Sequence, residues 1–424
     1  MEKYVVTGRQ KLSGTVRVSG AKNAVLPMLA STVLSSDPCA IIDAPRLKDV
    51  QVMSDILRQL GAVVKRQETG DGRCALVVDT KTMTDYEVPE ALMREMRSSI
   101  FLMGPLLGRH GRVRVSYPGG CAIGPRPIDL HLRGLRSLGA VIRERHGYIH
   151  AEAKELRGCE IHLDFPSVGA TENIMMAAVL AKGSTVIRNA AKEPEIIDLQ
   201  NFLNGMGARI RGAGMDVIRI DGVTRLSGVD YHVIPDRIET GTFMIAAAIT
   251  GGDISIENCI PEHVDSITAK LREVGAEITE ERDRMRVKGP ARPRAVDFKT
   301  LPYPGYPTDM QPQAMALMCI ADGISVITET IFESRFNQAE ELRRMGASIK
   351  TEGRTAVVRG VDMLFGARVE AFDLRGGASL TLAGLAAEGV TTIEGIHHMD
   401  RGYDGFDRKL SALGACVERV HENR

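Results

Sequence analysis

The chain has 424 residues, of which 44% are hydrophobic, so it is long enough for two domains and apolar enough to build large cores. Its 54 Lys and Arg residues balance its 54 Asp and Glu residues, which excludes a general nucleic-acid or membrane-surface binder because either needs an excess of positive charge. Aromatic residues make up only 4% and Trp is absent, which argues against a platform for stacking bases or sugars.

The seven cysteines are scattered and form no Cys-x-x-Cys pair, a pattern that favours reduced thiols over a disulfide framework or a zinc site. The N-terminal segment has no long apolar run, so it is expected to form a strand and not a signal peptide. The longest apolar runs are too short to cross a bilayer. We therefore expect a cytoplasmic protein without membrane insertion; the sequence identifies no protein partner.

A repeat of roughly seventy residues runs through the chain. Six times, a helical pattern that ends in a large apolar residue is followed by Gly-Ala and then by an apolar strand pattern. Each glycine is expected to end its helix in the left-handed conformation that glycine adopts without steric penalty. The six glycines are Gly61, Gly139, Gly207, Gly275, Gly346 and Gly414.

A second helix in each repeat is rich in Ala, Met and Leu and is apolar on nearly all sides, so it is expected to be buried. Alternating runs such as Thr185–Ala190, Asp253–Asn258 and Thr391–Ile396 predict strands. One repeat therefore has the pattern βαβαββ, with helices in the core and sheets outside. The six buried helices are expected to begin near Lys22, Arg97, Thr171, Glu239, Asp309 and Gly377.

The strand count assigns these repeats to two lobes. The sixth repeat lacks its last strand, and the N-terminal strand Tyr4–Thr7 belongs to no earlier repeat, so this strand is expected to complete the sixth. The predicted class is α/β, with lobe I formed by residues 1–21 and 235–424 and lobe II by residues 22–234. We expect ligands to bind in the cleft between the lobes. The alternative is a purely architectural repeat without chemistry.

Three segments carry residues suited to chemistry. Lys22 stands in the first turn of a buried helix, where it opposes the helix dipole at a cost of up to roughly 1 kcal/mol, and such local conflicts tend to mark functional positions. Cys121 lies in a loop rich in Gly and Pro, five residues from Arg126. A thiol near positive charge can act as an acid or a nucleophile. Asp309 follows a Pro-rich loop and could be a general base.

Each of these residues also has a simpler interpretation. Lys22 could be a solvated lysine beside an Asn cap, Cys121 an inert loop thiol, and Asp309 a helix N-cap. Five arginines at the ends of predicted elements could bind phosphate or carboxylate oxygens together with Lys22, or could form scattered surface ion pairs. These arginines are Arg97, Arg126, Arg335, Arg375 and Arg401.

The chain contains no Walker loop and no GxGxxG, HExxH or GxSxG motif, which argues against nucleotide hydrolysis, dinucleotide redox, zinc hydrolysis and serine esterase chemistry. The residues therefore indicate a site for an anionic substrate that uses no cofactor and no metal. One thiol and one carboxylate are available for proton transfer.

Ten motifs resemble the family of UDP-N-acetylglucosamine 1-carboxyvinyltransferases, also called UDP-N-acetylglucosamine enolpyruvyl transferases. They cover essentially the whole chain: GAKNAVLP, MRSSIF, PGGCAIGPRPIDLH, FPSVGATENIMMAA, AKEPEIIDLQNFL, PDRIETGTF, GYPTDMQPQ, TETIFESRF, DLRGGASL and DRGYD. The resemblance implies the enolpyruvyl transferase fold, two inside-out α/β lobes of three repeats each. It also implies transfer of the enolpyruvyl group of phosphoenolpyruvate to the 3′-hydroxyl of UDP-N-acetylglucosamine through a tetrahedral ketal, the first committed step of peptidoglycan synthesis.

The resemblance further implies roles for individual residues. Cys121 would protonate the methylene carbon and form a covalent phospholactoyl adduct, and it would be the thiol alkylated by fosfomycin. Asp309 would accept the proton of the sugar hydroxyl, with Lys22 and Arg401 completing the catalytic set. The residues implied to bind phosphoenolpyruvate are Lys22, Asn23, Arg126, Arg335, Arg375 and Arg401. Those implied to bind the UDP-sugar are Asn23, Arg97, Arg126, Pro127, Ile128, Asp129, Leu130, Ser167, Val168, Gly169, Asp309 and Ile331.

The chain departs from the family pattern at Pro125, Phe101, Phe165 and the neighbours of Arg335, and none of these changes removes a residue implied in the chemistry. Two alternatives stay open. One is the sister family of 3-phosphoshikimate 1-carboxyvinyltransferases, against which the cysteine in the loop argues. The other is a non-catalytic paralogue that only binds a UDP-sugar.

Overall fold

The computed structural model describes residues 2–68, 74–117 and 127–421, so Cys121, Pro125 and Arg126 lie outside the described residues. The chain divides into two compact units, with boundaries after Ser19 and Ile234. We call the unit with residues 2–19 and 235–421 lobe I, and the unit with residues 20–117 and 127–234 lobe II; each is described by itself. Within the described ranges, no helix is both long and apolar enough to cross a membrane.

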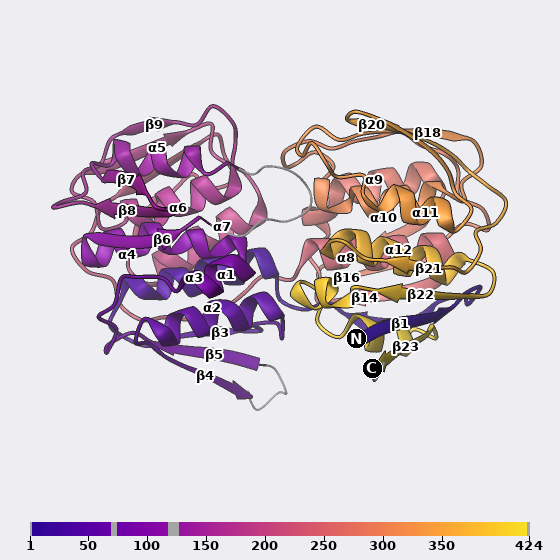
Figure 1. Cartoon of the computed structure of the whole chain (residues 1–424), viewed down its shortest axis with the longest axis horizontal. Helices are drawn as coiled ribbons and strands as arrows, with labels where there is room; N and C mark the ends of the chain where they lie inside the picture. The colour runs from indigo at the N-terminus through magenta and orange to yellow at the C-terminus, as the bar shows by residue number, and fades with distance from the viewer. Residues whose placement is uncertain (1, 69–73, 118–126, 422–424) are drawn as a thin grey trace. The chain divides into compact units, whose positions relative to one another are not determined.

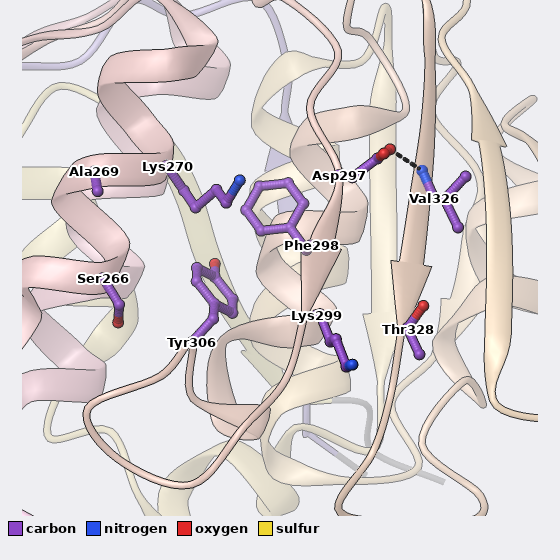
Figure 2. Close-up of a pocket in the computed structure, with 9 residues that line it drawn as sticks. All are labelled: Ser266, Ala269, Lys270, Asp297, Phe298, Lys299, Tyr306, Val326 and Thr328. Carbon is purple, nitrogen blue, oxygen red and sulfur yellow. Dashed lines mark hydrogen bonds between the residues drawn. The ribbon is translucent and has the colours of Figure 1, made fainter.

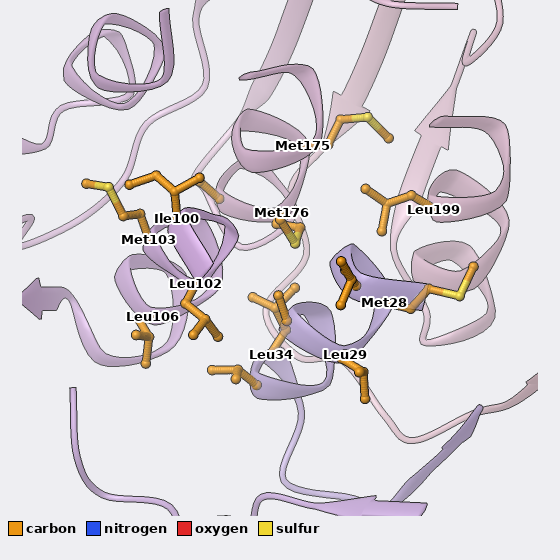
Figure 3. Packing of buried hydrophobic residues seen from close by; sticks show 14 of the residues in the cluster. Met28, Leu29, Leu34, Ile100, Leu102, Met103, Leu106, Met175, Met176 and Leu199 are labelled. Atoms are coloured by element: carbon orange, nitrogen blue, oxygen red, sulfur yellow. The ribbon is translucent and has the colours of Figure 1, made fainter. Parts of the chain in front are cut away.

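Lobe II is built around three buried helices, α1 (Lys22–Ser31), α4 (Met103–His110) and α6 (Val168–Ala178). Their Met, Leu and Ile side chains form a single core, seen from close by in Figure 3. The remaining helices are η1 (Thr32–Leu34), α2 (Lys48–Gln59), α3 (Glu90–Glu95), η2 (Arg97–Leu102), α5 (Asp129–Ser137) and α7 (Pro194–Gly205). The strands are β3 (Cys39–Ile42), β4 (Val63–Glu68), β5 (Cys74–Asp79), β6 (Arg112–Ser116), β7 (Val141–Arg145), β8 (Tyr148–Glu152), β9 (Glu160–His162), β10 (Ser184–Arg188), β11 (Arg209–Arg211), β12 (Val217–Asp221) and β13 (Asp230–His232).

Lobe I repeats this plan around α8 (Arg237–Thr250), α10 (Gln311–Met318) and α12 (Leu374–Ala386), which are buried over almost their whole length. Its other helices are η3 (Pro261–Val264), α9 (Asp265–Val274), η4 (Thr308–Met310), α11 (Gln338–Arg344), η5 (Ile396–Arg401) and α13 (Phe406–Ala412). Its strands are β1 (Glu2–Thr7), β2 (Ser13–Arg17), β14 (Asp253–Glu257), β15 (Glu277–Glu280), β16 (Arg284–Lys288), β17 (Phe298–Lys299), β18 (Ile324–Thr328), β19 (Ser348–Glu352), β20 (Thr355–Arg359), β21 (Arg368–Glu370), β22 (Val390–Glu394) and β23 (Cys416–His421).

These elements confirm the predicted α/β class, with buried helices and outer sheets. The glycines expected to end the outer helices all have a positive φ, between 91° and 107°, as the left-handed conformation requires. Five of the sheets share one strand order, an outer strand parallel to its neighbour followed by three antiparallel strands, as in β9-β10-β12-β11. The sheet β6-β8-β7 has a single parallel bridge, Glu87 to Arg114, in place of the outer strand.

The N-terminal strand completes the sixth repeat, as predicted. In the sheet β21-β22-β1-β23, strand β1 lies between two strands from the other end of the chain, pairing Tyr4 with Ile393 on one side and with Arg419 on the other. Figure 1 shows β1 in indigo beside the yellow β22 and β23. Strand β1 thus has the position that β12 has in the third repeat. Lobe I therefore needs both ends of the chain to close its third sheet.

The second buried helix begins later than predicted. The sequence pattern places its start near Arg97, but residues 97–102 form the 3₁₀ helix η2 and α4 begins at Met103. The reason is the buried side chain of Asn173, whose Nδ2 donates to the carbonyl of Ile100 (3.0 Å) and whose Oδ1 accepts from the N–H of Gly104 (2.6 Å). In a continuous α-helix these two backbone groups would bond each other. The amide of Asn173 replaces that bond and separates η2 from α4.

The role of β1 in closing the third sheet of lobe I can be tested by substituting one residue on each face of the strand. Val6 is fully buried beside Gly384 of α12, whereas Val5 points away from this core and is only half-buried. We expect Val6→Ala to lower the free energy of unfolding by about 2 kcal/mol and Val5→Ala by less than about 1 kcal/mol, measured by urea denaturation. Equal losses in the two variants would contradict the described packing of β1.

Candidate active site

Asp309 lies just before a buried helix, and the loop that leads to it packs against a neighbouring strand. The loop 302–307 leads into η4, which carries Asp309 and continues into α10. Its Tyr306 packs edge-on against Phe298 of β17, with 5.0 Å between ring centroids. Figure 2 shows these two rings between α9 and β17, where they help to line a surface pocket that contains none of the predicted site residues. The loop therefore fixes the backbone from which the Asp309 side chain projects.

The Asp309 carboxylate is bound by two arginines from different repeats of lobe I. Arg335 donates from Nη2 to Oδ1 at 2.8 Å, and Arg375 donates to Oδ2 from Nη2 at 3.0 Å and from Nε at 3.1 Å. The side chains of Arg335 and Arg375 are only 4% and 3% exposed, whereas that of Asp309 is 28% exposed. The N-cap interpretation of Asp309 is therefore wrong, and so is the interpretation of these two arginines as scattered surface ion pairs.

This pairing sets the protonation state of Asp309. Burial raises the pKa of its carboxyl group, but the positive charges of Arg375 and Arg335 and the hydrogen bonds that they donate lower it more. The net pKa lies well below the usual range of an aspartate, so the group is ionised at neutral pH. A carboxylate with such a low pKa is a weak base.

The same cluster presents donors that the described residues leave unused. Nε of Arg335 and Nη1 of Arg375 are buried and have no hydrogen-bonding partner among the described residues. Buried N–H donors without acceptors are unfavourable, and an anionic ligand with several oxygens would satisfy them.

Residues that the sequence did not single out hold both arginines in place. Arg375 lies in the first turn of α12, where the Asp373 side chain caps the helix by accepting from the N–H of Arg375 and of Gly376, each at 2.9 Å. Its guanidinium group lies 5.2 Å from the ring centroid of Tyr403. Arg335 donates from Nη1 to Thr308 at 3.0 Å. Asp373 follows the sequence pattern of an N-cap, whereas contacts such as that of Tyr403 depend on tertiary structure.

Lys22 of lobe II is paired as well. Its Nζ lies 2.7 Å from Oδ2 of Asp49 in α2, and the two side chains are 11% and 2% exposed. The unfavourable lysine at the N-terminus of α1 is thus compensated by a buried carboxylate from the next helix. The interpretation of Lys22 as a solvated lysine is wrong. Asn23, the next residue of α1, is half-buried and does not cap the helix, whose N-cap is Ala21.

Several residues predicted to bind the UDP-sugar lie on three elements that meet at Asn173. Arg97 begins η2, Asp129 begins α5, and the side chain of Ser167 caps α6 by accepting from the N–H of Ala170 at 3.3 Å. Besides bonding to the backbone at the break between η2 and α4, the Asn173 amide lies 3.1 Å from Nδ1 of His131 in α5. Sequence reasoning did not identify Asn173 or His131 as residues that hold these elements together.

The space around Gly169 shows how closely η2, α5 and α6 approach one another. A Cβ atom at this position would lie 3.1 Å from both the His131 and the Phe101 rings, so a larger residue would push them apart. The other residues of lobe II predicted to bind the UDP-sugar lie at the N-termini of α5 and α6. Pro127 and Ile128 precede α5, Leu130 lies in its first turn, and Val168 begins α6.

The remaining predicted residues are Cys121, Arg126, Arg401 and Ile331. Cys121 and Arg126 lie outside the described residues. Arg401 ends η5 and is half-buried, and Ile331 lies in the turn between β18 and Arg335. Across the described part of the chain, no group of three or more His, Cys, Asp and Glu side chains is arranged to hold a metal ion.

The cluster predicts a specific loss of stability for Asp309→Asn. Removing the carboxylate leaves two buried guanidinium charges unpaired, and we expect the free energy of unfolding at pH 7 to fall by about 3 kcal/mol. Because the pKa of Asp309 is lowered in the folded state, its contribution is present above the unfolded-state pKa of about 4 and is lost below it. The difference between wild type and variant, measured by urea unfolding, is therefore constant between about pH 5 and 8 and shrinks in more acidic solution.

A matched control is Asp253→Asn, because Asp253 also accepts two hydrogen bonds from one arginine, Arg286, at 2.9 and 2.7 Å, but on the exposed face of a sheet. This substitution is expected to change stability only slightly. Similar losses for the two variants would contradict the burial of the Asp309 cluster.

Comparisons with known proteins assign the chain to a family. The model of the family described as EPSP synthase (3-phosphoshikimate 1-carboxyvinyltransferase) matches residues 6–410. A protein of Symbiobacterium thermophilum named UDP-N-acetylglucosamine 1-carboxyvinyltransferase 1 is 62% identical over 420 residues, which are 99% of this chain and 95% of that protein. A UDP-N-acetylglucosamine 1-carboxyvinyltransferase of Geobacter metallireducens is 56% identical over 422 residues and covers 100% of both chains.

Solved structures share the fold. The enolpyruvyl transferase NikO from Streptomyces tendae superposes with a TM-score of 0.88 at 26% identity, covering 99% of both chains. An EPSP synthase from Acinetobacter baumannii superposes with a TM-score of 0.76 at 19% identity, covering 99% of this chain and 100% of that one, which bears on the fold alone. Full-length identity above one half, together with this fold, shows that the chain belongs to the family of UDP-N-acetylglucosamine 1-carboxyvinyltransferases.

Proposed function

We propose that this protein transfers the enolpyruvyl group of phosphoenolpyruvate to the 3′-hydroxyl of UDP-N-acetylglucosamine and releases phosphate, as a step of peptidoglycan synthesis. The observation that carries the proposal is the 62% identity to a relative of that name across 99% of the chain. The geometry of lobe I supports it, because Arg335 and Arg375 hold a carboxylate and still have buried donors without partners.

In this proposal the two arginines bind the carboxylate of phosphoenolpyruvate, with Arg401 as a third cation. The negative charge of the bound substrate offsets the charges of the two arginines, so the pKa of Asp309 rises and the carboxylate can accept the proton of the sugar 3′-hydroxyl. Substrate binding would thus make the base effective at the moment when the hydroxyl is in place. Lys22 and Arg126 are proposed to neutralise the phosphate group, and Asn23 to contact both substrates.

The chemistry proceeds by addition and elimination. The sugar oxygen forms a bond to the central carbon of phosphoenolpyruvate while Cys121 donates a proton to the methylene carbon, which gives a tetrahedral ketal. The carbon–oxygen bond to phosphate then breaks and the methyl group returns a proton to the Cys121 thiolate, which restores the double bond in the product. Cys121 is also proposed to form the covalent phospholactoyl adduct by addition of its S–H across the same double bond, with sulfur bonding to the central carbon as the methylene carbon gains a proton.

Lobe II is proposed to bind the UDP-sugar through the ends of η2, α5 and α6. Arg97 can pair with a phosphate oxygen, and the first turns of α5 and α6 present backbone N–H groups. The proposed contacts are Asn23, Arg97, Arg126, Pro127, Ile128, Asp129, Leu130, Ser167, Val168 and Gly169, with Asp309 and Ile331 from lobe I. We also propose a cytoplasmic location, which fits the six described cysteines as free thiols.

Phosphate release tests this function against its alternatives. The purified protein is incubated with phosphoenolpyruvate and, in separate arms, with UDP-N-acetylglucosamine, with shikimate 3-phosphate and with neither. We expect release only with the UDP-sugar. Release with the shikimate ester alone would support the sister activity, and no release in any arm would support a protein that only binds.

The assignment of Cys121 has its own test. Fosfomycin is expected to alkylate Cys121, and Cys121→Asp is expected to abolish the modification, as detected by mass spectrometry of peptides. Cys416 is an internal control because it is a free and exposed thiol. A label on Cys416, or on any other cysteine, that persists in the variant would show that the covalent role is wrongly assigned.

A further inference from the structure

Glu329 is a buried carboxylate to which the proposed mechanism gives no role. It directly follows β18 and is 1% exposed. Its Oε1 accepts from the hydroxyl of Thr300 (2.9 Å) and from the N–H groups of Ile331 (2.9 Å) and Phe332 (3.2 Å). Its Oε2 accepts from the hydroxyl of Thr308 at 2.8 Å. All four donors are neutral, and within the described ranges no ion pair to Glu329 is formed, so these hydrogen bonds are what stabilises the buried carboxylate.

The hydrogen bond between Thr308 and Glu329 determines the direction in which the Thr308 hydroxyl donates its proton. An ionised carboxylate can only accept, so the single hydroxyl proton of Thr308 points toward Glu329. A lone pair of Thr308 is then left to accept from Nη1 of Arg335, which lies at 3.0 Å. The second terminal nitrogen, Nη2, bonds to Asp309. Glu329, Thr308 and Arg335 are therefore linked by two successive hydrogen bonds, which we call the relay. The relay fixes the rotation of the Arg335 guanidinium group about its long side chain.

Glu329 also fixes the backbone that leads to Arg335. Its bonds to the N–H groups of Ile331 and Phe332 shape the turn after β18. The Phe332 ring lies over the Arg335 guanidinium group, with 5.2 Å to the ring centroid. The same turn is tied to Thr300 through Thr330, whose N–H and hydroxyl donate to Thr300 at 2.9 and 2.6 Å. One carboxylate thus controls both the path of the chain and the direction of the guanidinium group.

We propose that Glu329 is a positioning residue which, through Thr308, aims the unused Nε donor of Arg335 at the substrate carboxylate. This inference rests on the proposed function, because it assumes that Arg335 binds phosphoenolpyruvate. Glu329 itself touches no reacting atom. Its effect should appear in the binding of one substrate and not in that of the other.

The relay can be interrupted at either of its two members. Glu329→Gln places an amide where two hydroxyls and two N–H groups need acceptors, and Thr308→Val removes the hydroxyl with little change of shape. We expect each variant to raise KM for phosphoenolpyruvate about tenfold and to leave KM for UDP-N-acetylglucosamine within about twofold. Because both changes break the same relay, the double variant is expected to resemble the worse single variant. Thr308→Ser keeps the hydroxyl and is expected to stay within about twofold of wild type in both constants.

Thr300→Val is the matched control. It removes a buried hydroxyl that donates to Glu329 and accepts from the N–H of Thr330, but it leaves the bonds of Thr308 to Glu329 and to Arg335 in place. We expect it to lower the melting temperature at least as much as Thr308→Val while keeping KM for phosphoenolpyruvate within about twofold of wild type. This control separates a positioning effect from a general loss of stability.

The outcomes distinguish a wrong role for Glu329 from a wrong proposed function. An active wild-type enzyme whose Thr308→Val and Glu329→Gln variants keep a normal KM for phosphoenolpyruvate would overturn the role of Glu329 and leave the proposed function intact. Equal effects of Thr300→Val and Thr308→Val, additive effects in the double variant, or no rescue by Thr308→Ser would do the same. A wild-type protein that releases no phosphate in any substrate arm would overturn both proposals.

Discussion

The binding of one carboxylate by two buried guanidinium groups is the interaction on which the proposed chemistry of lobe I depends. Taking three charged groups out of water is expensive, and it is tolerated only where the ion pairs and hydrogen bonds are well formed. Asp309 meets this condition with three hydrogen bonds from Arg335 and Arg375. Asp309 does not satisfy the two remaining buried donors, Nε of Arg335 and Nη1 of Arg375, and the proposed function assigns them to an anionic substrate.

The repeated architecture explains why the charged groups gather at the ends of helices. Each central helix is buried along its length, so its first turn is the place where a charged side chain can leave the apolar core. Lys22 and Arg375 both stand in such first turns, where a cation opposes the helix dipole. Each is compensated by a carboxylate from another helical segment, Asp49 for Lys22 and Asp309 for Arg375. The local conflict in the sequence is thus resolved by tertiary contacts.

Buried polar residues without a direct role in the chemistry hold the charged residues in position. Asn173 interrupts the backbone between η2 and α4 and contacts α5, so that the ends of three elements in lobe II stay together. Glu329 has the corresponding place in lobe I, where it joins the ends of β17 and β18 to η4. Both side chains form hydrogen bonds with backbone groups that have no partner within a helix or strand. Even a conservative replacement of either residue is therefore expected to lower stability.

Local sequence patterns were enough to predict the repeat, the α/β class, the buried helices, the left-handed glycines and the closure of the last sheet by the N-terminal strand. These features follow from hydrophobic periodicity and glycine position, which are local and are repeated six times. The lobe boundaries and the roles taken from family resemblance stay predictions. Tertiary structure alone decided that Asp309 faces Arg335 and Arg375, that Lys22 pairs with Asp49, and that Glu329 and Asn173 connect the ends of distant elements. The physical reason is that such contacts join residues far apart in the chain, and local patterning sets which face of an element is buried but not which polar group meets it there.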